Sequence, residues 1–147
     1  MTTILEASAA IVAALEAVPN LTVFAGGVPD DQVMPRDDGG RVKPYAVVYI
    51  GAGRTSSDRH GGMRPAANVP LDLSIPLQVT AAAGTYEGAL WAVGKVRLAL
   101  SGVQLLDAAT TSRLREDADA GRAQEDKSVP SDVRWYLPMQ YRFTTTT

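Results

Sequence analysis

The sequence contains no cysteine and one histidine, His60. The absence of cysteine excludes disulfide bonds, thiolate catalysis, and zinc or iron–sulfur sites built on sulfur ligands. A single histidine without a second ligand beside it is a poor metal site. Its neighbours are Asp, Arg and Gly residues, which predict an exposed loop histidine. We therefore expect no metal ion and no cofactor.

Long apolar runs and a strong excess of charge are also missing. No run approaches the roughly 20 apolar residues that span a bilayer, so no membrane partner is expected. The chain begins Met-Thr-Thr and lacks the basic start of a signal peptide, which predicts synthesis in the cytoplasm. The net charge of −2 gives no overall attraction to phosphate backbones and disfavours direct, sequence-specific nucleic-acid binding.

The 147 residues fit one domain, residues 1–147, that is large enough to bury its own core. Thr3 and Glu6 have the spacing of a capping box, which predicts a first helix ending near Pro19-Asn20. A short strand is expected at residues 21–24. A Gly- and Pro-rich connection then leads to a strand at residues 44–50 (PYAVVYI), which is apolar on both faces and predicts a sheet covered on both sides.

Two further strands alternate between apolar and polar residues, at residues 71–80 and 133–143. Pro76 and Pro138 lie within them, and because proline cannot donate to a ladder, each strand is predicted to be an edge or to carry a bulge. Residues 110–129 are expected to form a hairpin that turns near Ala120-Gly121. The four closing threonines are expected to be a frayed tail.

A second helix is predicted at residues 85–100 and is unusually apolar. Its main apolar stripe comprises Tyr86, Ala89, Leu90, Val93, Val96 and Leu100. Trp91 and Leu98 form a second apolar ridge away from that stripe. Because a surface helix of a monomer is usually more polar, we interpret this ridge as a contact with another subunit.

The long polar interruption at residues 51–70 separates two strong strand signals. Hairpin loops usually take two to five residues, and structureless loops beyond about 12–15 residues are uncommon unless they are functional or disordered. Gly51-Ala52-Gly53 resembles the start of a dinucleotide-binding turn, but Ser56 occupies the place of the third glycine. A strand exit that uses glycine for unusual backbone angles is the preferred interpretation.

The same interruption carries three arginines spaced by five residues, Arg54, Arg59 and Arg64, together with Asp58. Two interpretations stay open for this charged arm. The arginines are able to pair with acidic loops of a neighbouring subunit. Alternatively, they are solubilising charge on a loop.

The order of these segments resembles a known family. VFAGGVP, PYAVVYIGAG, QVTAAAG, ALWAVGKVRLAL and a final strand ending YRF with threonines follow one another along nearly the whole chain. This order is similar to that of the tail terminator proteins of long-tailed bacteriophages, related to the minor tail protein U family. The resemblance implies an α/β (α+β) fold with a mixed, largely antiparallel sheet, two main helices and a long inter-strand loop.

The resemblance also implies a function without catalysis. A terminator is a homo-oligomeric ring, a hexamer in that family, which caps the head-proximal end of the tail tube and stops its polymerisation. Its expected partners are the tail tube protein and the head-completion or connector protein, with DNA passing through the ring. The expected location is the virion tail or neck. Two alternatives stay open: a head–tail neck protein, and a small ligand-binding or hydrolytic α/β domain with residues 51–70 as a lid.

Overall fold

The computed structural model describes residues 3–55, 72–104 and 106–146. Two helices and seven strands follow one another in the order α1 (Ile4–Glu16), β1 (Thr22–Ala25), β2 (Tyr45–Ile50), β3 (Arg54–Thr55), β4 (Asp72–Ala83), α2 (Tyr86–Leu100), β5 (Arg115–Glu116), β6 (Gln124–Asp126) and β7 (Arg134–Thr146). The strands form one sheet in the order β1-β2-β4-β7-β5, with β3 beside β4 and β6 beside β7. β1 runs parallel to β2, and the other pairings are antiparallel. The predicted mixed, largely antiparallel fold with two main helices is confirmed.

Both helices begin with a side chain that satisfies a backbone amide. At α1, the Glu6 amide donates to the Thr3 hydroxyl at 3.1 Å, and the Thr3 amide donates to the Glu6 carboxylate at 2.7 Å. This is the predicted capping box. At α2, the Gly88 amide donates to the Thr85 hydroxyl at 3.0 Å. These caps fix where each helix starts.

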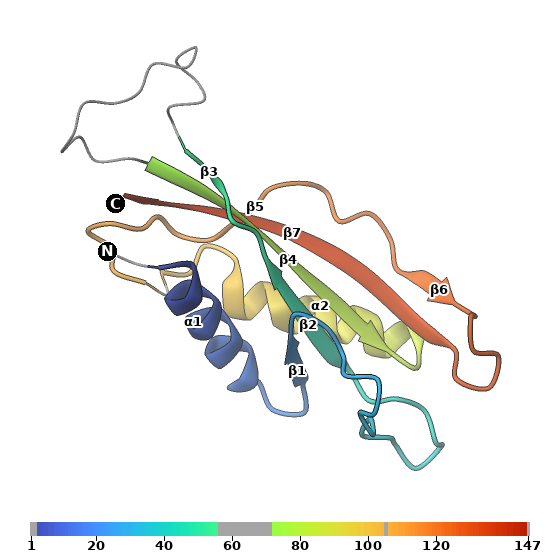
Figure 1. The fold of residues 1–147 in the computed structure, drawn as a ribbon. Helices are drawn as coiled ribbons and strands as arrows, with labels where there is room; N and C mark the ends of the chain where they lie inside the picture. The colour runs from blue at the N-terminus through green and yellow to red at the C-terminus, as the bar shows by residue number, and fades with distance from the viewer. Residues whose placement is uncertain (1–2, 56–71, 105, 147) are drawn as a thin grey trace.

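The two helices cover one face of the sheet, here called the inner face (Figure 1). The alternating side chains of β4 and β7 meet them there and are almost fully buried: Ile75, Leu77, Val79, Ala81, Leu137, Met139, Tyr141 and Phe143. β4 and β7 pair along their whole lengths, from Asp72 opposite Thr146 to Ala83 opposite Trp135. The period-two pattern of both strands therefore correctly predicts their buried sides.

The opposite face of the sheet, here called the outer face, carries a second and smaller core. Tyr45 and Val47 of β2 pack there with Met34, Val42 and Ala82. Met34 and Val42 come from the Gly- and Pro-rich connection at residues 26–43, which crosses this face. The prediction that β2 is covered on both sides is confirmed for Tyr45–Val48, whereas Tyr49 is 43% exposed.

A β-bulge separates β2 from β3. Ile50 is opposite Leu77 and Arg54 is opposite Ser74. The three residues between Ile50 and Arg54 therefore face only two residues of β4. Gly53 adopts φ +82°, and a Cβ there would lie 2.6 Å from the Ser74 carbonyl oxygen. The strand exit that uses glycine for an unusual backbone angle is therefore confirmed.

The two strand prolines face gaps in the pairing. The Pro76 carbonyl accepts a hydrogen bond from the Gly51 amide at 2.9 Å. The backbone N–H that proline lacks would point to the same side, toward the bulge. β4 is thus a central strand that faces a bulge of the neighbouring β2–β3 strand, and both predicted alternatives, an edge strand and a strand that carries a bulge, are wrong for it. Pro138 lies on β7 between the end of the β5 pairing at Tyr141 and the start of the β6 pairing at Tyr136. The backbone N–H that Pro138 lacks would point into this gap, where no described strand lies beside β7.

Two predictions for the C-terminal third are wrong. β5 and β6 do not form a hairpin, because both pair antiparallel with β7 and therefore run in the same direction. The closing threonines are not frayed through residue 146, because β7 continues to Thr146. Thr145 is buried and its hydroxyl lies 3.2 Å from that of Thr111, which ties the strand end to the preceding loop.

Candidate interaction surfaces

The outward side of α2 carries three exposed apolar side chains, here called the α2 ridge: Leu90, Trp91 and Leu98. Trp91 is 37% exposed and Leu98 is 78% exposed. Gly94 lies between them, and a Cβ there would meet no atom within 4 Å. The predicted exposure of Trp91 and Leu98 is confirmed, and their contact with another subunit stays a prediction.

The buried side of α2 differs from the predicted stripe. Leu90 is 43% exposed and belongs to the ridge, and Tyr86 is exposed to the same extent. Ala92 takes their place against the sheet, with Ala89, Val93, Val96 and Leu100. Small side chains on this side let the helix approach the sheet closely. The prediction chose the large apolar side chains of the helix and therefore included Leu90. It missed Ala92, although the helical position of Ala92 between Ala89 and Val96 places it on the buried side.

Basic side chains flank the α2 ridge. The Lys95 ammonium lies over the Trp91 ring, 5.6 Å from its centre. Arg97 forms an ion pair with Glu116 of β5, with Nε 2.6 Å from Oε1. This ion pair fixes one flank of the helix against the sheet edge, while Lys95 stays on the outward side with the tryptophan.

The charged arm is described only at its start. Arg54 lies in β3, in register with Ser74 of β4. Asp58, Arg59 and Arg64 lie outside the described residues, as do Ser56 and His60. Arg54 is in the sheet layer, whereas Trp91 and Leu98 are on the outward side of the helix layer. Among the described residues, the structure therefore does not bring Arg54 together with Trp91 and Leu98 within one chain.

A groove crosses the outer face of the sheet and was not predicted. This sheet groove has a volume of about 550 Å³, and its apolar lining is Val28, Tyr45, Val47, Tyr49, Ala82, Val129 and Tyr136. The connection at residues 26–43 supplies one wall and the turn between β6 and β7 supplies the other. Val129 is 52% exposed at its rim. No local pattern joins these segments, because they are brought together only by the pairing of the strands.

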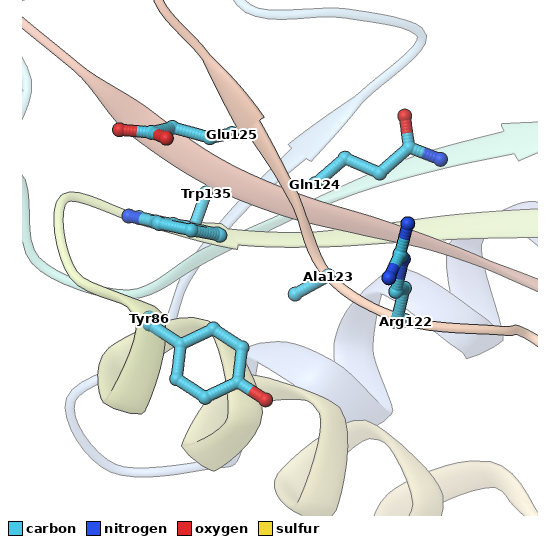
Figure 2. A pocket seen from close by; sticks show the side chains of 6 residues that line it. All are labelled: Tyr86, Arg122, Ala123, Gln124, Glu125 and Trp135. Atoms are coloured by element: carbon cyan, nitrogen blue, oxygen red, sulfur yellow. The ribbon is translucent and has the colours of Figure 1, made fainter.

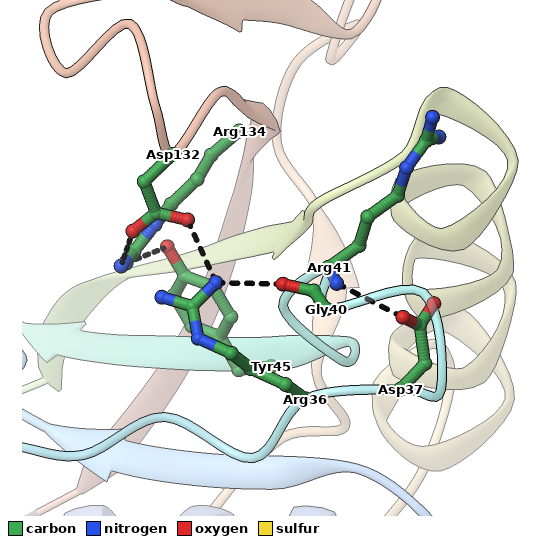
Figure 3. A network of polar contacts seen from close by, with 7 residues as sticks. All are labelled: Arg36, Asp37, Gly40, Arg41, Tyr45, Asp132 and Arg134. Atoms are coloured by element: carbon green, nitrogen blue, oxygen red, sulfur yellow. Dashed lines mark hydrogen bonds and ion pairs between the residues drawn. The ribbon is translucent and has the colours of Figure 1, made fainter.

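A charged network holds one end of the sheet groove together (Figure 3). Asp132 accepts hydrogen bonds from Arg36 at 3.1 Å and from Arg134 at 2.8 Å. Arg36 also donates to the Gly40 carbonyl at 2.9 Å, and Arg134 donates to the Tyr45 hydroxyl at 3.2 Å. The hydrogen bonds from Arg36 and Arg134 lower the pKa of Asp132. The network thus ties the wall at residues 26–43 to the turn before β7.

The remainder of the outer face is polar. Gln140 donates to Gln78 at 2.9 Å across β7 and β4. Arg142 donates to the Ser74 hydroxyl at 2.9 Å and forms an ion pair with Asp117 at 3.1 Å. These side chains satisfy one another along the pleat, so this part of the face presents hydrogen-bonding groups rather than an apolar patch.

A second hollow lies between the start of α2 and β6 (Figure 2). It has a volume of about 680 Å³ and is lined by Tyr86, Arg122, Ala123, Gln124, Glu125 and Trp135. The Tyr86 and Trp135 rings meet edge to face with their centres 5.3 Å apart. One carboxylate, one guanidinium and two aromatic rings are suited to holding a flat or charged group by contact.

Within the described part of the chain, no group of three or more His, Cys, Asp or Glu side chains is placed to hold a metal ion. Neither of the described helices is long and apolar enough to cross a membrane. Comparison of the sequence with models of protein families and with curated proteins gives no match.

Proposed function

We propose that the protein is a ring-forming structural subunit that terminates the tail tube of a long-tailed bacteriophage. The observation that carries this proposal is the α2 ridge, in which Trp91 and Leu98 stand exposed on one side of a helix whose other side is fully packed. Exposed aromatic and apolar side chains on one side of a helix are typical of protein–protein contacts. The resemblance of the order of sequence segments to that of the terminator family supports the choice of a terminator among proteins that assemble.

In this proposal the chain acts by blocking a surface. A ring of subunits binds to the last ring of the tube and covers the surface that would recruit the next ring of tube protein. Its other side then receives the head-completion or connector protein, and DNA passes through the centre. The ring is expected to be a hexamer, as in the family that the sequence resembles. No step of this mechanism requires a catalytic group.

The first experiment measures the mass of the purified chain by light scattering and images the same fractions by negative stain. The proposal predicts six times the mass of one chain and a ring with a central hole. A monomer at all concentrations, or an oligomer without a hole, would contradict it.

The second experiment separates a terminator from a neck protein. Purified tail tubes and purified portal complexes are each mixed with the chain and sedimented. A terminator binds tube ends and, when added to polymerising tube protein, shortens the tubes at a small molar fraction. Binding to the portal alone would favour the neck protein instead.

A small ligand-binding domain is the second candidate, and the hollow beside Tyr86 and Trp135 favours it. Its volume of about 680 Å³ is within the range of about 300–1,000 Å³ that is usual for small-molecule sites. This candidate predicts a monomer whose melting temperature rises with a flat, charged ligand. Replacing Trp135 with Ala would abolish that shift, whereas a terminator requires no such ligand.

A further inference from the structure

We propose that the α2 ridge of one subunit inserts into the sheet groove of the next subunit, so that the ring is built by one repeated ridge-to-groove contact. This inference rests on the proposed ring function and names the two surfaces that form it. The partner of the sheet groove is therefore a second copy of this chain.

The two surfaces lie on opposite sides of the molecule. Ala92, Val93 and Val96 hold α2 against the inner face of the sheet, so Trp91 and Leu98 project away from it. The sheet groove opens on the outer face, where Val47 and Tyr49 of β2 form its floor. A contact between two different surfaces of the same chain is heterologous and leaves each subunit with one surface for each neighbour. Such contacts close into a ring when the rotation per subunit divides a full turn.

The shapes of the two surfaces suit one another. Trp91 and Leu98 are seven residues apart, which separates them by about 10 Å along the helix axis. Gly94 between them leaves the helix backbone open to close approach. The groove of about 550 Å³ is large enough for a bulky aromatic side chain and keeps Tyr49 and Val129 exposed for contact. The ridge therefore supplies two projections, and the groove supplies a depression with an apolar floor and a polar rim.

One charge on each surface complements the other. Lys95 lies beside Trp91 and forms no ion pair among the described residues. Asp126 lies at the rim of the groove; it accepts a hydrogen bond from the Ser128 amide at 2.9 Å and likewise has no ion-pair partner in the described ranges. The other rim carboxylate, Asp132, is already held by Arg36 and Arg134. Lys95 and Asp126 are thus the complementary pair that insertion of the ridge would bring together.

The absence of cysteine makes this contact directly testable by cross-linking. In a double variant with Lys95→Cys and Asp126→Cys, the two positions lie on opposite sides of one chain, so a short bismaleimide can join them only between chains. We expect a ladder of covalent oligomers that ends at the size of the ring. Each single-cysteine variant is the matched control and should give no ladder.

Charge reversal supplies a second measurement that does not depend on the linker. Lys95→Glu and Asp126→Lys should each weaken assembly by at least about tenfold, because each places like charges together. The variant that carries both changes should recover assembly to within about threefold of the original chain. Circular dichroism and thermal unfolding of each variant show that its fold is retained.

The outcomes distinguish this inference from the proposed function. If the unmodified chain forms a ring but the double-cysteine variant gives no ladder, the ridge-to-groove contact is wrong and the ring stands. If the single variant with Lys95→Cys gives covalent dimers, the ridge pairs with itself and the inference is overturned. If the unmodified chain forms no ring, the proposed function itself fails.

Discussion

The two faces of the sheet are built on different principles. The inner face is apolar over most of its area, and residues such as Ile75, Leu77 and Met139 are at most 1% exposed beneath two helices. The outer face is mixed, with a small core at one end, a groove beside it, and a polar row that includes Gln78 and Gln140. Burial on the inner face accounts for the stability of the fold, since its apolar area is fully removed from water. The outer face and the outward side of α2 keep apolar and charged side chains exposed.

The largest expected effect tests the inner face. Ile75→Ala removes a side chain that is 1% exposed between the sheet and the helices, and the resulting cavity should cost about 2–5 kcal/mol of unfolding free energy. Urea unfolding followed by circular dichroism measures this loss. The matched control is Val33→Ala, at a position that is 86% exposed, which should change stability by no more than about 0.5 kcal/mol. Equal effects of the two changes would contradict the role of the inner face as the buried core.

The charged network on the outer face should have a smaller effect that depends on pH. Hydrogen bonds from Arg36 and Arg134 lower the pKa of Asp132, so its ionised form is favoured in the folded chain. Its contribution is present above the unfolded pKa of about 4 and is lost as the pH falls through the lower folded value. Asp132→Asn should therefore cost about 1 kcal/mol at neutral pH and reduce the loss of stability in acid.

The measurement for this network is urea unfolding at about pH 7 and about pH 3, since these values bracket the titration of a carboxyl group. Asp38→Asn is the control, because Asp38 is exposed and forms no ion pair within the described residues. If Asp132→Asn and Asp38→Asn gave the same dependence on pH, the network would not hold the groove wall.

A comparable effect at neutral pH is expected on the inner face at its polar margin. The Tyr141 hydroxyl lies 3.1 Å from Ser101 and 3.4 Å from Glu116, and burial raises the pKa of Tyr141 to about 12. Since the unfolded value is about 10, stability should fall as the pH rises from about 10 to about 12. Tyr141→Phe should cost about 0.5–1.5 kcal/mol at neutral pH and reduce that alkaline loss.

Thermal unfolding across the alkaline range checks this prediction. Tyr86→Phe is the matched control, because Tyr86 is 43% exposed and has no hydroxyl hydrogen bond within the described ranges. An unchanged alkaline loss in Tyr141→Phe would show that another group titrates there.

The sequence predicted those parts of the fold that depend on local patterns. The Thr3–Glu6 capping box, the alternation in β4 and β7, and the double-sided burial of β2 each follow from residues close together in the chain. The exposed pair Trp91 and Leu98 was also predicted, because a helix with two apolar sides leaves one of them outward.

The remaining features depend on pairing between distant segments. β5 and β6 are too short for a pattern of their own and are strands because β7 lies beside them. Thr145 is buried because β4 and the loop at Thr111 enclose the end of β7. The sheet groove forms for the same reason, because residues 26–43 and the turn before β7 meet across β2 and β4. The residues of any one of these segments, taken alone, do not indicate that the segments lie together.

The most direct test of the central claim is the mass, by light scattering, of the original chain and of two variants with retained fold. Trp91→Asp places a charge in the α2 ridge, and Leu5→Asp places the same charge on an 80% exposed position of α1. The account predicts a ring-sized mass for the original chain and for Leu5→Asp, and the mass of a single chain for Trp91→Asp. A ring-sized mass for Trp91→Asp would show that the α2 ridge does not join the subunits.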